Sequence, residues 1–204
     1  MYGEKPPLRF KDLASMAGAV RLSKAMGGDV QDALALKARA ETHLDISPEL
    51  ADVEIGRVDS GAMFQAGENR IGLSSPDLDV MEHELEHAKA LGEGGSGIYR
   101  SLVNLSKGMT ALAAMGAAPA VIGINSMVDD PRKRMALLRT LAGVSAAAAI
   151  PNIFEEGRAS TNVLLDSPDK AQTLRSLAPG FAKHVAAGAL APGIFLAGSK
   201  FQGF

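Results

Sequence analysis

The chain contains no cysteine and no tryptophan, and aromatic residues make up only 4% of its 204 residues. The lack of cysteine excludes disulfide bonds, thiolate catalysis and zinc sites built on cysteine, so any metal ion must be held by histidine and carboxylate side chains. The 21 basic and 23 acidic residues nearly balance, and the longest basic run is Arg132-Lys133-Arg134. Because gripping a phosphate backbone requires a concentrated basic surface, we expect no nucleic-acid partner.

The first residues lack the charged, apolar and small-residue order of a secretory signal, since Glu4, Lys5, Arg9 and two prolines fall within residues 1–11. We therefore expect no cleavable signal peptide and an N-terminal region in the cytoplasm. A chain of 204 residues with 47% apolar content suits one globular domain or two small ones.

The N-terminal part of the chain mixes helical and strand patterns. Between residues 10 and 44, apolar residues recur with helical spacing and are interrupted at Gly27-Gly28, which predicts two short amphipathic helices. Between residues 53 and 74, short apolar runs are separated by Gly61 and by Gly67-Glu68-Asn69. This second pattern predicts two or three strands joined by tight turns.

A third helix is predicted from about Pro76 to Leu91, because Ser75 is a suitable cap and acidic residues follow it. The glycine-rich segment 92–97 should end this helix, and it formally has the spacing of a dinucleotide-binding loop. That loop requires a strand directly before it, whereas a helix precedes this segment. We therefore interpret residues 92–97 as a flexible linker.

Three segments farther along carry no Asp, Glu, Lys or Arg, namely 108–128, 140–154 and 185–199. Only the first reaches the ~20 residues of a bilayer span. The second becomes long enough if 135–138 join it and Arg139 snorkels to the interface. Two interpretations of these segments remain open: helices that contact a membrane, or small-residue helices buried in a soluble bundle. Basic residues flank both ends of the pair formed by the first two segments, so the orientation of this pair in a membrane also remains open.

The sequence His83-Glu84-Leu85-Glu86-His87 carries the strongest chemical signal. On a helix, positions i and i+4 share one face, so His83 and His87 can bind one zinc ion. Glu84 can then act as general base toward a metal-activated water without occupying the coordination sphere. A solvated helix face and a purely structural zinc site remain as alternative interpretations.

A third protein ligand should come from a distant segment. The other two histidines, His43 and His184, are isolated, and each is expected to be a satisfied or exposed side chain rather than a ligand. Two adjacent acidic residues, Glu155 and Glu156, directly follow the second apolar segment. Negative charge beside the end of a buried helix is costly unless a partner stabilises it. A metal ion would be such a partner.

With these motifs the sequence resembles the gluzincins, zinc proteases with a helical His-Glu-x-x-His motif and a distant glutamate ligand. It is most similar to the membrane-embedded branch, the heat-shock membrane proteases and prenyl-protein endopeptidases, and to a group of bacterial neutral zinc metallopeptidases. In those families the glutamate opens a Glu-x-x-Ala-Ser motif, which residues 156–160 match. The resemblance therefore implies His83, His87 and Glu156 as zinc ligands. Glu86 departs from the family, which usually has glycine there.

The resemblance and the residue patterns together predict an α+β fold, mostly helical, with a small β-sheet beside the active-site helix and Ala/Gly-rich apolar helices in the C-terminal half. We expect N-terminal amphipathic helices in 1–50 and a zincin-like catalytic core in 51–165. An apolar helical hairpin at about 101–154 would be inserted in that core, and 166–204 would form a C-terminal apolar helical segment. In such proteases an edge strand beside the active-site helix holds the substrate by backbone pairing.

The family implies peptide-bond hydrolysis, so the expected function is that of a membrane-associated zinc metalloendopeptidase acting on peptide or protein substrates. The tetrahedral oxyanion needs an electrophilic partner, and the available side chains are Tyr99, His184 and Arg158. Ser160 and Glu155 are candidates for orienting the ligands. We expect the active site on the cytoplasmic side of the membrane, with a soluble cytoplasmic protein as the second choice.

A function of a different class also fits the composition. The Ala/Gly-rich segments could pack closely against partner helices in a non-enzymatic membrane-active or assembly protein, with a structural zinc or none. Small-residue faces would also permit homo-oligomers. This alternative shares the membrane contact and differs in the role of zinc.

Overall fold

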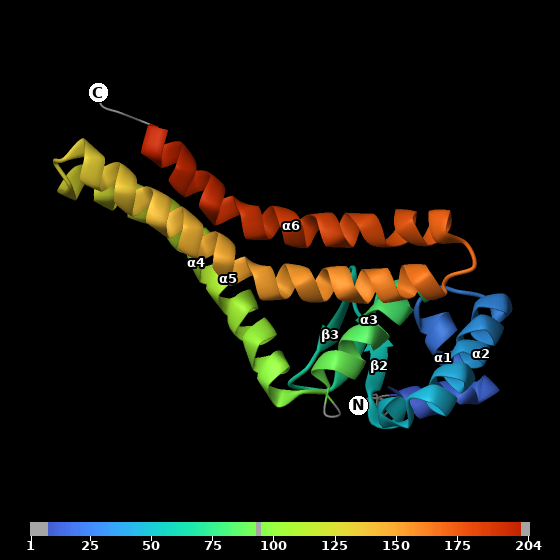
Figure 1. The fold of residues 1–204 in the computed structure, drawn as a ribbon. Coiled ribbons are helices and arrows are strands. Elements are labelled where there is room, and N and C mark those ends of the chain that lie inside the picture. The colour runs from blue at the N-terminus through green and yellow to red at the C-terminus, as the bar shows by residue number, and fades with distance from the viewer. Residues whose placement is uncertain (1–7, 93–94, 201–204) are drawn as a thin grey trace, which may run out of the picture. The chain divides into compact units, whose positions relative to one another are not determined.

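The structure is a computed structural model that describes residues 8–92 and 95–200 (Figure 1). The sequence expectations for residues 1–7 and for Glu93-Gly94 of the linker lie outside these residues. The chain divides into two compact units, which are described separately below. The first unit combines Met1–Arg100 with Ala159–Leu177, and the second combines Ser101–Arg158 with Ala178–Phe204.

The first unit begins with the two predicted amphipathic helices, α1 (Met16–Ala25) and α2 (Val30–Ile46). Each has a side-chain cap, since Ser15 accepts a hydrogen bond from the backbone of Gly18 and Asp29 accepts two from the start of α2. The break between them contains Gly27 at φ +80°, a conformation that favours glycine. The prediction of two short helices separated at this glycine pair is confirmed.

A small mixed sheet follows, and it contains three strands where two or three were predicted, together with a short one at the N-terminus. Two 3₁₀ turns, η1 (Phe10–Ala14) and η2 (Pro48–Asp52), connect it to the helices. Its strand order is β1-β2-β4-β3, with β2 and β4 parallel and the other pairs antiparallel. The strands are β1 (Leu8–Arg9), β2 (Glu54–Arg57), β3 (Ala62–Gln65) and β4 (Arg70–Leu73).

The tight turns around β3 have the expected residues. Gly61 has φ +70° before β3, and Asn69 has φ +48° before β4. Asparagine and glycine tolerate this left-handed region better than other residues, which explains why the strands are separated at these positions. The two-residue strand β1 was not predicted, because two residues are too few to show an alternating pattern.

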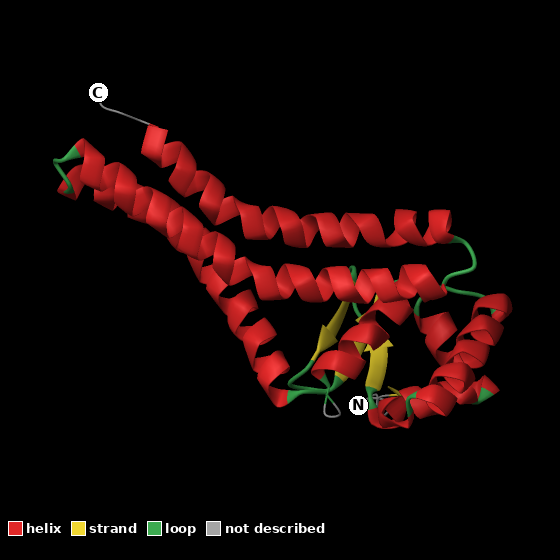
Figure 2. Cartoon of the chain, viewed as in Figure 1, coloured by secondary structure: helices red, strands yellow, loops and turns green. Residues whose placement is uncertain are grey.

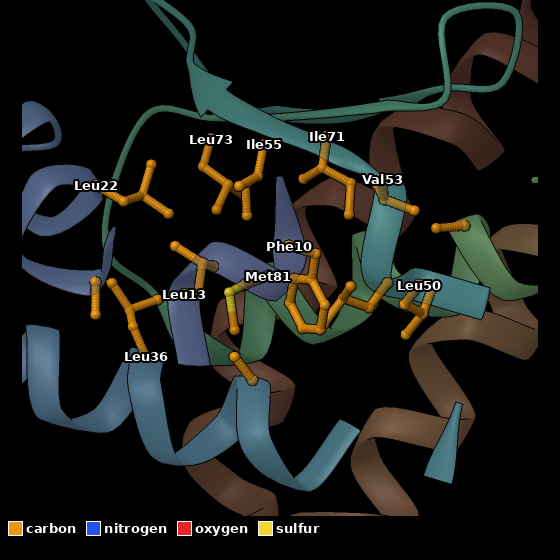
Figure 3. Close-up of a cluster of buried hydrophobic side chains, with 14 of the residues drawn as sticks. Phe10, Leu13, Leu22, Leu36, Leu50, Val53, Ile55, Ile71, Leu73 and Met81 are labelled. Carbon is orange, nitrogen blue, oxygen red and sulfur yellow. The ribbon is translucent and has the colours of Figure 1, made fainter. Parts of the chain in front are cut away.

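One face of the sheet forms the hydrophobic core of the first unit. Figure 3 shows Ile55, Ile71 and Leu73 pointing from the strands toward the side chains of η1 and the helices, and all three are almost fully buried. Phe10 of η1 and Met81 of the third helix lie within the same cluster. The apolar alternation of the strands therefore serves to fix the sheet against these helices.

The helix that carries the His-Glu-x-x-His motif, α3, spans Leu78–Leu91 and packs against β3 and β4. It starts two residues later than predicted, and the prediction of Ser75 as its cap is wrong. Asp77 is the cap, because its Oδ1 accepts hydrogen bonds from the backbone of Asp79 and Val80. The helix ends at Gly92 as predicted.

Two further helices contribute to the first unit. They are α5 (Pro131–Asp166), through its segment from Ala159 onward, and α6 (Lys170–Lys200), through its first turns. Hydrogen bonds join both to α3: Asn162 Nδ2 donates to Glu86 Oε2 at 2.6 Å, and Ser176 Oγ to Asp77 Oδ2 at 3.1 Å. The motif helix is thus held on one side by the sheet and on another by α5 and α6.

The second unit consists of helices within the described residues (Figure 2). It contains α4 (Gly97–Met127) from Ser101 onward, α5 up to Arg158, and α6 from Ala178 onward. A small cluster joins all three helices, with Ala117 from α4, Leu138 from α5 and Ala191 and Phe195 from α6 at its centre. The small residues allow close approach of the helix backbones.

All three of these helices are long and apolar enough to cross a membrane. Counting uncharged residues alone indicated sufficient length for 108–128 only. The difference arises because α5 and α6 continue as unbroken helices past the charged residues that bound their uncharged segments. The predicted fold class, α+β and mostly helical with a small sheet beside the motif helix, is confirmed.

Candidate metal centre

Helix α3 brings the two motif histidines together as the i, i+4 spacing predicts. The Nε2 atoms of His83 and His87 lie 3.1 Å apart, and the ring planes are inclined by 86°. Two nitrogen ligands at about 2.0–2.1 Å from a tetrahedral zinc ion would be separated by roughly 3.3 Å. The imidazole pair therefore has close to the separation that a shared zinc ion requires.

Glu156 completes the group. One ligand atom from each of His83, His87 and Glu156 lies within 4.8 Å of the others, which makes these three residues a group that can hold a metal ion. Glu156 is only 4% exposed. An ionised carboxylate is costly to bury unless it is paired or coordinates a metal, so a cation at this position would stabilise it.

Helix α5 explains how a residue so distant in sequence reaches this position. Ser160 lies one turn after Glu156 on α5, and its Oγ is 3.4 Å from Nδ1 of His83. The hydroxyl is thus within reach of the ring nitrogen opposite to the Nε2 atom that faces His87. A contact of this kind can orient a metal-binding imidazole, which is the role that the sequence suggested for Ser160.

Glu84 follows His83 directly on α3 and is buried. The donor set of the group, two imidazoles and one carboxylate, is the set found in catalytic zinc sites that leave a fourth position for water or substrate. The residues present therefore fit zinc, and Glu84 is the additional carboxylate next to the first ligand. This arrangement can support metal-assisted hydrolysis.

Glu86, where the resembled family usually has glycine, is held in place by two neighbours. Asn162 Nδ2 donates to its Oε2 at 2.6 Å, and Lys89 Nζ donates to its Oε1 at 2.7 Å. Sequence reasoning missed Asn162, because no local pattern marks a partner 76 residues away. The larger side chain at this position links α3 to α5.

His184, expected to be isolated, lies beside Glu156 within the second unit. Its Nε2 is 3.5 Å from Oε1 of Glu156, and its Nδ1 is 3.3 Å from Nδ2 of Asn152. A neutral imidazole satisfies both contacts when Nδ1 accepts from the amide and Nε2 carries the proton toward the carboxylate. Asn152 lies one turn before Glu156 on α5, so these three side chains form a short polar chain.

The series of backbone hydrogen bonds within α5 is interrupted one turn before Glu156, although the helix itself continues. Pro151 has no backbone N–H, and the hydroxyl of Ser106 from α4 enters the helix next to it. Ser106 Oγ donates to the carbonyl of Ala148 at 2.6 Å and accepts from the backbone N–H of Asn152 at 3.1 Å. This hydroxyl bridges two backbone groups that would otherwise bond to each other, and such insertions bend helices.

The remaining candidates from the sequence have other environments. Glu155 is fully buried and accepts two hydrogen bonds of 2.8 Å from the guanidinium of Arg158. Arg158 is thus engaged by a neighbour on its own helix. Tyr99 is half-buried near the start of α4, where its backbone N–H donates to Ser96 Oγ at 3.4 Å.

Comparison with protein-family models, curated proteins and solved structures finds no match. The chemistry of the residues themselves therefore carries the functional argument.

The surroundings of α3 also contain charged side chains outside the metal-binding group. Arg39 of α2 forms an ion pair with buried Glu82, and His43 Nε2 lies 3.7 Å from the same carboxylate. His43 also packs edge-on against Phe10. In the first turn of α3, burial raises the pKa of Asp79, while a hydrogen bond with Thr173 opposes that shift.

Proposed function

We propose that this protein is a membrane-associated, zinc-dependent metallopeptidase. The observation that carries the proposal is the convergence of His83, His87 and Glu156 on one point, with Glu84 adjacent to the first ligand. Zinc, when bound, would polarise the substrate carbonyl and make the attacking water more acidic. The protein side chains would supply the remaining steps.

In this proposal Glu84 is the general base. Its carboxylate would take a proton from the attacking water and later deliver a proton to the departing amine. The two histidines and Glu156 would hold the metal ion, and Ser160 would orient the ring of His83. These roles need no residue beyond those that α3 and α5 already bring together.

Among the three candidates for stabilising the oxyanion, we favour His184. Arg158 is engaged by Glu155, whereas the Nε2 atom of His184 lies beside the carboxylate of Glu156. A donor at that position could interact with negative charge developing near the metal. The variant His184→Gln should lower kcat by about 100-fold, the lower end of the cost of one lost oxyanion donor, while the zinc content remains unchanged.

The sheet provides a place for the substrate backbone. Strand β3 (Ala62–Gln65) lies at the edge of the sheet and packs against α3, the helix that carries Glu84. An edge strand presents unpaired N–H and C=O groups that can pair with an extended peptide. We therefore propose extended peptide segments as the substrate class, bound by strand addition along β3.

The second unit supports membrane association. Its helices are long and apolar enough to span a bilayer, and they expose many large apolar side chains. Large apolar side chains exposed in such number on long helices are typical of a membrane or protein contact. The exposed large side chains of the three helices include Leu105, Met109, Leu112, Met115, Ile122, Leu137, Val144, Ile150, Leu190 and Leu196.

A pair of variants tests the proposed function. Glu84→Gln should retain zinc and lose hydrolysis of a mixture of unfolded protein substrates, because the amide cannot accept the proton from water. His83→Ala should lose both zinc and activity. Peptidase activity that persists in purified Glu84→Gln would contradict the proposal, and wild-type protein without zinc after reconstitution would favour the non-enzymatic assembly protein.

A further inference from the structure

The three helices of the second unit are aligned with one another at two levels. Near one end, Ser106 of α4 contacts the carbonyl of Ala148 on α5, and Asn152 of α5 contacts His184 of α6. Charged residues follow at this same level on each helix. The nearest ones are Lys107, Glu156 and Lys183.

A second set of contacts lies farther along the unit, at about the midpoint of the uncharged segment of α4. Ala117, Leu138 and Phe195 pack in one cluster there. A Cβ added to Gly198 would lie 2.5 Å from Val121 Cγ1, so α6 approaches α4 very closely. Beyond these contacts the helices again reach charged residues, which are Asp129, Asp130, Arg132, Lys133, Arg134 and Lys200.

The distance between the two charged levels matches a bilayer. Residues 108–127 of α4 carry no charged side chain, and about 20 helical residues extend about 30 Å, the thickness of the hydrocarbon core. The uncharged segments of the other two helices, 140–154 and 185–199, have 15 residues each and extend about 22 Å, so α5 and α6 reach the full thickness only with the residues that flank these segments. Arg139 is exposed and lies about 7 Å along α5 from Arg134, close enough for its long side chain to extend toward that charged level.

Side-chain size also has the distribution that a lipid environment favours. The contacts between helices use small residues such as Ala117, Ala142, Ala191 and Gly188, whereas Leu112 and Met115 are exposed. In water, large apolar side chains would be the ones buried. Close packing through small residues with large apolar groups facing outward is typical of helices in a bilayer.

We infer that the second unit crosses a lipid bilayer three times. Helix α4 runs from the first charged level to the second, α5 returns, and α6 runs outward again. The turn at 128–130 and the end of α6 at Lys200 therefore emerge on one side. The chain segments that lead to the first unit at Arg100, Ala159 and Leu177 emerge on the opposite side. This inference extends the proposed membrane association and does not depend on zinc or on peptidase activity.

The absence of cysteine makes the inference directly testable. Single cysteines would replace exposed residues in the first unit (Gln31→Cys), in the turn (Asp129→Cys) and at the end of α6 (Lys200→Cys). Each full-length variant would be labelled with a membrane-impermeant maleimide in sealed inside-out vesicles of the expression host, before and after detergent. We expect positions 129 and 200 to behave alike, so that both react before detergent or both react only after it. Position 31 should show the opposite behaviour.

Two controls keep the result interpretable. Leu112→Cys, at the middle of α4, should react more than ten-fold more slowly than Asp129→Cys in both conditions, because the thiolate that attacks maleimide does not form in hydrocarbon. Wild-type protein should resist extraction from the vesicles by alkaline carbonate. The carbonate extraction uses the wild-type protein, and the labelling control changes one exposed apolar side chain of α4.

Three outcomes would overturn the inference. If Lys200→Cys is labelled together with Gln31→Cys, α6 does not cross the bilayer. If all three positions are labelled before detergent, or if carbonate extracts the wild-type protein, the unit does not span the membrane. Labelling in the Glu84→Gln background should be identical, so failure of the topology and failure of the proposed chemistry are distinguishable.

Discussion

The side-chain amide of Asn162 donates a hydrogen bond of 2.6 Å to Oε2 of Glu86. This contact joins α5 to the helix that carries both histidines, at a position one residue before His87. A partly buried carboxylate that loses such a donor pays a desolvation penalty. The contact therefore helps to hold α3 against the part of α5 that belongs to the first unit.

Asn162→Ala should consequently destabilise the protein by about 1.5–3 kcal/mol, the range for a hydrogen bond to a charged group. Asn162→Asp should cost more at neutral pH, because it places a second carboxylate against Glu86. The exchanged pair Glu86→Gln with Asn162→Asp restores a donor and an acceptor and should recover part of the loss. Chemical unfolding in detergent measures all three, and Asn104→Ala on an exposed part of α4 is the control. Equal stability of Asn162→Ala and the control would contradict this prediction.

The metal content of the protein should depend on Glu156 and not on its neighbour Glu155. Glu156 belongs to the group that can hold a metal, whereas Glu155 is engaged by Arg158. Elemental analysis should find about one zinc ion per chain in the wild type and in Glu155→Gln, and a strongly reduced content in Glu156→Gln. The two changes are matched in size and charge. Loss of zinc in Glu155→Gln but not in Glu156→Gln would contradict this prediction, because it would identify Glu155 as the ligand.

The hydroxyl of Ser106 should stabilise the interrupted part of α5. Ser106→Ala removes one donor to Ala148 and one acceptor for the N–H of Asn152, so we expect a loss of about 1–2 kcal/mol in the free energy of unfolding. Ser126→Ala provides the comparison, because that hydroxyl donates to the carbonyls of Ile122 and Gly123 on its own helix. Its removal should change stability by less than about 0.5 kcal/mol. Equal effects of the two variants would show that the bridge contributes nothing beyond an ordinary hydroxyl.

Asp79 should destabilise the folded protein at neutral pH. Burial raises the pKa of this carboxyl above its ordinary value of 3.8, so the folded state binds this proton more tightly than the unfolded state. Its contribution to stability is present at low pH and is lost as the pH rises through the folded-state pKa. Asp79→Asn should therefore raise the unfolding temperature at pH 7, and the difference should shrink as the pH falls below about 4. A difference that is constant from pH 3 to 7 would contradict this assignment.

Some features of the fold could be predicted because they depend on neighbours within a few residues. The spacing of His83 and His87 placed two imidazoles on one helix face, and their 3.1 Å separation follows from the helical period. The break at Gly27 and the turns at Gly61 and Asn69 were predictable for the same reason, since backbone conformation there depends on the residue itself.

The start of α3 shows the limit of such local reasoning. Ser75 and Asp77 are both suitable caps, and the sequence could not rank them. Asp77 also accepts a hydrogen bond from Ser176, 99 residues away, which only the packed first unit supplies. A tertiary contact thus accompanies the choice between two nearly equivalent local signals.

The sequence by itself determined which residue types could hold a metal ion, the approximate position of each helix and the one uncharged segment, 108–128, that is long enough for a membrane. Tertiary structure alone decided which side chains meet across those helices: Asn162 with Glu86, His184 with Glu156, and Ser106 with the backbone of α5. The physical reason is range. Hydrophobic periodicity and capping act over three or four residues, whereas these contacts join residues 28 to 76 positions apart and exist only once the helices have packed.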